Sequence, residues 1–109
     1  MGVVSNIFRT QMLIARQHDL QAFIGDLTEA KVELANSVTD YIDAGQNLDD
    51  DSPTLKRLKA RREKLELMEK KIDLRLKEYE NKLQMVNTQL QSLEGSTSQM
   101  IQSSFQYKL

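Results

Sequence analysis

The sequence contains few side chains that could perform chemistry, and they stand apart from the partners that chemistry requires. His18 is the single histidine among 109 residues, and cysteine is absent. A zinc centre or a nucleophilic catalytic pair needs several such groups at fixed spacing. We therefore interpret His18 as a surface side chain and expect no enzyme activity, no metal and no cofactor.

Asp49, Asp50 and Asp51 resemble the first residues of a calcium-binding loop. Such a loop needs Gly at its sixth position and Glu at its twelfth. Counted from Asp49, these positions hold Thr54 and Ala60, and Pro53 occupies the fifth. The sequence also lacks a glycine-rich phosphate loop and a nucleophile elbow. We interpret the aspartates as part of a polar turn.

A dense basic block runs from Lys56 to Lys64 and suggests a third chemistry, neutralisation of nucleic-acid phosphates. The net charge of the chain is −1, however, and no aromatic side chains are interleaved with the block for base stacking. The acidic turn also lies close by. The sequence therefore favours a solvated basic face over nucleic-acid binding.

No lipid anchor or membrane span is expected from the sequence. Gly2 begins a near-match to the N-myristoylation pattern, but Asn6 stands where that pattern needs Ser or Thr. No run of about 18 apolar residues is present to span a bilayer.

The composition favours long helices. Charged residues make up 28% of the chain and aromatic residues 6%, with only 4 Gly and 1 Pro. Strands joined by tight turns need more Gly and Pro, so an all-β fold is excluded. Apolar residues at alternating steps of four and three predict a first helix over about 3–44. Its seam residues are Leu20, Ile24, Leu27, Leu34 and Val38.

A turn over about 45–52 separates this helix from a second one. Gly45 fits the left-handed residue that follows many helices, Ser52 fits an N-cap, and Pro53 fits the first helical position. The second helix is expected over about 53–94. Gly95 suggests a break, followed by a terminal helix over about 96–106. The seam of the second helix comprises Ile72, Leu76, Tyr79, Leu83, Val86 and Leu90.

Two helices joined by so short a turn should fold back as one all-α antiparallel hairpin domain, residues 1–109, with a long coiled-coil second helix. Opposite charges in the two halves favour this pairing. Residues 1–54 carry three bases and nine acids, whereas residues 55–109 carry twelve bases and seven acids. One seam without an enclosed core is marginal alone, so we expect the chain to be oligomeric.

The segments near both ends of the sequence are apolar and nearly uncharged. Residues 1–18 contain Arg9 and Arg16 as their charges, and residues 95–109 contain Lys108. A hairpin brings both segments to one end, where an apolar patch would favour an interface. The predicted assembly residues are Val3, Val4, Ile7, Phe8, Met100, Ile101, Phe105 and Leu109.

The layout resembles that of type III secretion needle subunits and related flagellar axial and filament proteins. The resemblance rests on the turn Asp50-Asp51-Ser52-Pro53 and on the low-charge segment Met100-Ile101-Gln102-Ser103-Ser104-Phe105. It implies a helical hairpin whose ends pack inside a helical polymer of copies. It also implies an extracellular or cell-surface location for a secreted subunit; otherwise the location would be cytoplasmic.

Two functional hypotheses follow. The first is a structural subunit that self-assembles into a filament or secretion-type tubular assembly through its apolar ends. The second is a coiled-coil adaptor or secretion chaperone that binds a partner helix along the long seam. Open polymers would favour the first hypothesis, and a fixed small complex would favour the second.

Overall fold

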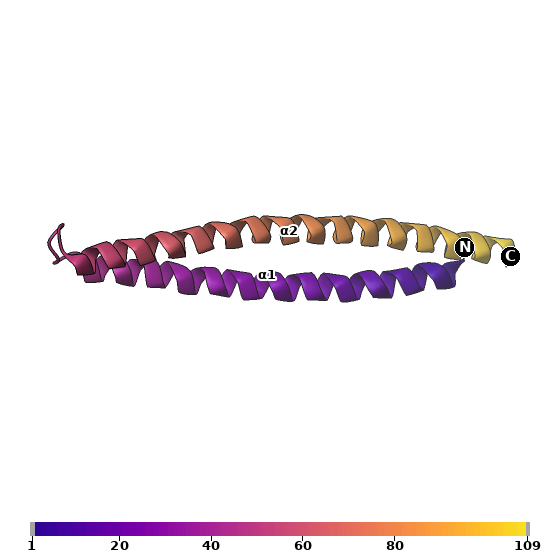
Figure 1. Cartoon of the computed structure of the whole chain (residues 1–109). Helices are drawn as coiled ribbons and strands as arrows, with labels where there is room; N and C mark the ends of the chain where they lie inside the picture. Colours follow the sequence, from indigo (N-terminus) through magenta and orange to yellow (C-terminus); the bar gives the residue numbers. More distant parts are fainter. Residues whose placement is uncertain (1, 109) are drawn as a thin grey trace. The chain divides into compact units, whose positions relative to one another are not determined.

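A computed structural model describes residues 2–108, with side chains up to Ser103 and at Phe105. The described chain consists of two α-helices, α1 (Val3–Gly45) and α2 (Pro53–Lys108), joined by a short turn (Figure 1). The predicted all-α helical hairpin is therefore confirmed. α1 continues one residue beyond its expected end, and α2 begins at Pro53 as the proline signal indicates.

The expected end of the second helix at residue 94, with a separate helix over 96–106, is wrong. α2 runs through Gly95 without interruption. No described glycine has a positive φ, so Gly95 keeps helical geometry. A single Gly costs a helix about 1 kcal/mol relative to Ala. Ending the helix there would instead leave several backbone groups without their intrahelical partners.

Gly45 is likewise not the left-handed residue that the sequence suggests, because it forms the last residue of α1 with a negative φ. Its role is steric. A Cβ at this position would lie 3.0 Å from Leu55 Cδ1, and Leu55 is buried at 7% exposure. Gly45 thus allows the first turn of α2 to pack closely against the end of α1.

Backbone hydrogen bonds define the turn. The Leu48 N–H donates to the Gly45 carbonyl at 3.2 Å, and the Ser52 N–H donates to the Asp49 carbonyl at 2.9 Å. The Ser52 carbonyl then accepts a bond from the Lys56 N–H at 3.2 Å. Accepting the first intrahelical bond is what an N-cap residue does, so Ser52 occupies the predicted position.

The chain divides into two compact units, each built from both helices. The terminal unit pairs α1 up to Phe23 with α2 from Tyr79 onward, and the turn unit comprises Ile24–Glu78. In each unit a segment of α1 packs antiparallel to a segment of α2. A heptad register fits both helices, with Ile24 and Leu55 at a positions. Every a and d position from Val3 to Gly45 and from Leu55 to Met100 is buried or half-buried.

The core of the terminal unit is small. Leu20, Val86 and Leu90 are buried at 4–7% exposure, and Leu13, Tyr79 and Leu83 pack against them while half-buried. No side chain that the structure describes is completely buried. A seam between two helices always leaves one side of each pair near water, which explains why burial is shallow.

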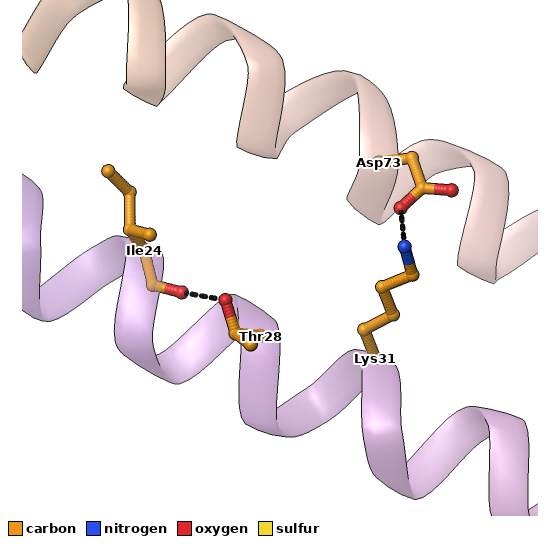
Figure 2. Close-up of polar contacts among 4 residues, drawn as sticks. All are labelled: Ile24, Thr28, Lys31 and Asp73. Carbon is orange, nitrogen blue, oxygen red and sulfur yellow. Dashed lines mark hydrogen bonds and ion pairs between the residues drawn. The ribbon is translucent and has the colours of Figure 1, made fainter.

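Hydroxyl side chains inside the helices bond to their own backbone. In the turn unit, the Thr28 hydroxyl donates to the Ile24 carbonyl at 2.7 Å (Figure 2). Ser37 and Thr39 make the same contact with the carbonyls of Glu33 and Ala35, each at 3.1 Å. These bonds satisfy polar groups that would otherwise compete with the helical backbone.

Candidate assembly interface

The predicted assembly residues lie in the terminal unit, except Leu109, which is outside the described residues. The structure divides the others into two groups. Val3 and Met100 are half-buried seam residues. The remaining five are exposed apolar side chains, and they are Val4 (82%), Ile7 (47%), Phe8 (63%), Ile101 (54%) and Phe105 (65%).

Four of these five exposed side chains form two pairs, and the members of each pair lie one helical turn apart. Val4 and Phe8 lie at positions i and i+4 of α1, directed away from the seam. Ile101 and Phe105 have the same spacing on α2, and therefore share one face of that helix. Each pair presents adjacent apolar surface to solvent rather than a single scattered residue.

The last turns of α2 have no partner segment of α1 beside them. Asn6 lies opposite Ser96 and Met100, and α1 begins only three residues before Asn6. α2 continues past the beginning of α1, as Figure 1 shows at the end where both chain termini lie. Phe105 is on this overhang, which explains its exposure.

Asn6 is a buried polar residue in the seam at this end, and it is not among the seam residues predicted from the sequence. Its side chain is only 7% exposed. The amide Nδ2 donates to Ser96 Oγ at 3.4 Å and weakly to Met100 Sδ at 3.7 Å. The heptad spacing does place Asn6 in the seam, since Asn6 precedes Leu13 and Leu20 by seven and fourteen residues. A search for apolar residues alone passes over a polar residue in a seam position.

A further kind of polar contact occurs once in each unit, and the two examples lie two heptads apart on both helices. In the terminal unit, Gln17 Nε2 donates to Asn87 Oδ1 at 2.7 Å. In the turn unit, Lys31 Nζ lies 2.6 Å from Asp73 Oδ1 (Figure 2). Both contacts join an a position of α1 to an e position of α2. A polar side chain in the seam thus reaches out to a flanking residue of the opposite helix and fixes the register.

The electrostatics of this ion pair are local. The hydrogen bond from Lys31 to the Asp73 carboxylate, and the negative charge of that carboxylate, raise the pKa of Lys31. The two side chains are 41% and 44% exposed, so water and salt screen the attraction.

Two open grooves flank the seam of the terminal unit. One groove of about 480 Å³ lies along Arg9, Met12, Leu13, Thr88, Gln89, Ser92 and Leu93. The other, of about 420 Å³, lies along Ile7, Thr10, Gln11, Glu94, Thr97 and Ser98. The Thr97 hydroxyl is buried beside the second groove without a hydrogen-bond partner. Shallow apolar grooves of this kind suit side chains of another helix better than they suit a polar substrate.

The eleven predicted seam residues are buried or half-buried in their units. Leu20, Val86 and Leu90 are buried, and the other eight are half-buried. His18 is exposed, as are Asp49, Asp50 and Asp51. Among residues 2–108, no group of three or more His, Asp or Glu side chains is arranged to hold a metal ion. Neither described helix has a stretch apolar and long enough to cross a membrane.

Comparison with known proteins adds no family to this description. No protein-family model, no curated protein and no solved structure matches the chain.

Proposed function

We propose that this protein is a structural subunit that assembles with copies of itself through the apolar surface of its terminal unit. The observation that carries the proposal is the end of α2, where Ile101 and, on the overhang, Phe105 are exposed while the segment around them is almost without charge. Apolar surface of this kind is stabilised when another chain covers it.

The overhang suits assembly because it contributes little to the hairpin itself. Phe105 lies beyond the beginning of α1 and is 65% exposed, so its side chain adds little to the packing between the two helices. Removing the Phe105 side chain should therefore leave the seam intact. Val4 and Phe8 of another copy offer apolar surface of the same kind, and the grooves beside the seam can receive large side chains.

The double substitution Ile101→Ser with Phe105→Ser tests the proposal. Light scattering and negative-stain microscopy should show assemblies for the unchanged chain. The variant should remain as separate hairpins that do not assemble. The matched control is Met85→Ser, because Met85 is also on α2 of the terminal unit and is 62% exposed. This control should assemble as the unchanged chain does.

Assembly that survives the double substitution would exclude the proposed interface. A complex of fixed small size, unaffected by that substitution, would instead favour the coiled-coil adaptor or secretion chaperone. The same microscopy distinguishes an open filament or tube from a closed oligomer. Far-UV circular dichroism of the variant checks that the helices remain formed.

A further inference from the structure

The outer face of α2 in the turn unit carries a row of apolar residues that the hairpin does not use. Leu67 and Leu74 are 59% and 68% exposed and stand seven residues apart. With Leu55 at an a position, both occupy f positions, opposite the seam. Ala60, also exposed, precedes Leu67 by the same interval. Seam packing therefore cannot explain this row.

Lysines border the row on both sides. Lys64 and Lys71 occupy c positions, and Lys70 and Lys77 occupy b positions; all four are exposed. Two acids, Glu63 and Glu78, share this outer face, but the four lysines outnumber them, so the face keeps a net positive charge. The face thus combines an apolar centre with flanking positive charge, which suits a partner that is negative with some apolar surface of its own.

The outer face of α1 in the same unit has the complementary pattern. Asp26, Glu33 and Asp40 occupy c positions seven residues apart, and all are exposed. Glu29 and Asp43 lie at neighbouring f positions. Val32, beside Glu33, is 56% exposed. In residues 24–52 the single base is Lys31, which the seam holds against Asp73.

These two faces do not neutralise each other within one chain. Residues 24–78 are all described, and they contain two ion pairs, Lys31 with Asp73 and Arg62 with Glu66. The second pair lies within α2, at 3.7 Å between Arg62 Nε and Glu66 Oε1. Both outer faces point away from the seam, so the acidic row of a chain cannot reach its own lysine row.

We propose that the acidic outer face of α1 in one copy docks on the basic outer face of α2 in a second copy, within their turn units. Val32 then covers the row of Leu67 and Leu74, while the acids, which all lie to one side of Val32, approach the lysines along one border of that row. Both rows repeat every seven residues, or roughly 10 Å along a helix, so their charges fall into step. Each copy carries both faces, so the contact is heterologous and can repeat from copy to copy.

This inference rests on the proposed function in one respect, namely that the partner is a copy of this chain. Its residues are separate from the terminal interface, so the two contacts can fail independently. An anionic membrane surface or a nucleic acid would also attract the lysine row. The acidic row on the same unit favours a second copy of the chain as the partner, because a membrane surface or a nucleic acid would repel that row.

Charge reversal provides the test. One variant carries Asp26→Lys, Glu33→Lys and Asp40→Lys, and the other carries Lys64→Glu, Lys71→Glu and Lys77→Glu. Each variant then has two outer faces of like charge, so each alone should lose side-by-side association by about tenfold or more in sedimentation velocity at low salt. An equimolar mixture should recover the association of the unchanged chain. Circular dichroism checks the helicity of each variant.

Cross-linking locates the contact, because the chain has no cysteine of its own. A chain with Val32→Cys mixed with a chain with Leu74→Cys should form a disulfide between copies under mild oxidation. The matched control replaces Leu74→Cys with Met68→Cys, since Met68 is 51% exposed but lies toward the flank of the seam. This control should cross-link several-fold more slowly.

Association that is unchanged in both reversal variants, or that mixing fails to restore, would overturn the proposal. So would equal cross-linking by the two cysteine pairs, or lysine-dependent binding to anionic vesicles or an oligonucleotide in place of association between copies. To separate this contact from the terminal one, the Val32 and Leu74 cross-link is repeated with Ile101→Ser and Phe105→Ser in both chains. Its persistence supports the turn-unit contact even if the terminal interface proves wrong.

Discussion

The terminal unit and the turn unit use the same heptad register but stabilise it differently. The terminal unit has the buried cluster of Leu20, Val86 and Leu90, and its seam contacts from Asn6 and Gln17 join neutral side chains. The turn unit holds its register with an ion pair and buries Leu55 against Gly45. Its outer faces are densely charged, whereas the terminal unit exposes apolar side chains near the ends of the sequence.

This difference shows that one seam can serve two kinds of surface. Side chains at a and d positions specify the pairing of the helices, while those at b, c and f positions remain available for other chains. In the terminal unit these outer positions are mostly uncharged, and apolar side chains among them such as Val4, Phe8 and Phe105 favour coverage. In the turn unit they are charged and favour selective contact, because like charges repel the wrong face.

Leu90→Ala should produce the largest loss of stability and tests whether the terminal unit contains the stronger core. Leu90 is 7% exposed, so truncation removes buried apolar surface and should lower the free energy of unfolding by about 2–3 kcal/mol. Urea denaturation followed by circular dichroism measures this change. Leu34→Ala is the comparison in the turn unit, where the half-buried side chain should cost about 1 kcal/mol. Equal losses would remove the contrast between the units.

Asn6→Leu should raise the free energy of unfolding by about 1 kcal/mol, because a polar residue in a helical seam specifies pairing at a cost in stability. The hydrogen bonds that Asn6 would lose are long, at 3.4 and 3.7 Å. Thermal unfolding of Asn6→Leu and of the unchanged chain shows whether the substitution raises or lowers stability. Asn6→Ala serves as the control and should destabilise, since it removes those bonds without adding apolar surface. If Asn6→Leu also destabilises, the Asn6 amide stabilises the folded chain in addition to specifying how the helices pair.

The elements of the fold could be predicted because their signals are local. The steps of four and three placed the seam, and Ser52 with Pro53 placed the start of α2. Whether Gly45 and Gly95 adopt left-handed or helical backbone could not be read from the residue type, because glycine tolerates both. The decision depended on Leu55 packing at one glycine and on continued hydrogen bonding at the other.

The candidate surfaces were predictable only in part. The apolar character of the end segments is visible in the sequence, but the division between seam residues such as Met100 and exposed ones such as Phe105 depends on where α1 begins. Asn6 escaped notice because its polarity masked its seam position. The row of Leu67 and Leu74 fell outside the seam pattern, so its exposure became evident only once the opposite face of α2 was occupied.

Gly25→Ala should stabilise the turn unit by roughly 0.5–1 kcal/mol, because Ala favours a helix over Gly and a Cβ at Gly25 has nothing within 4 Å. Gly45→Ala should yield a clearly smaller gain or a loss, since its Cβ would lie 3.0 Å from Leu55 Cδ1. Gly95→Ala extends the comparison to the terminal unit and should resemble Gly25→Ala. Melting temperatures of the three variants rank them. A gain at Gly45 equal to that at Gly25 would show that Leu55 moves aside without cost.

The smallest expected effect concerns pH and distinguishes the ion pair of the turn unit from the neutral contact of the terminal unit. The pKa of Lys31 is raised in the folded chain by its hydrogen bond to Asp73. Its stabilising contribution is therefore complete below the unfolded-state pKa of about 10.4 and is lost as the pH rises through the higher folded value. Lys31→Met should flatten this alkaline loss in urea titrations, whereas Gln17→Met should leave it unchanged because neither Gln17 nor Asn87 titrates. An identical alkaline slope for Lys31→Met and the unchanged chain would mean that solvent screens the pair completely, and that the apolar seam alone sets the register of the turn unit.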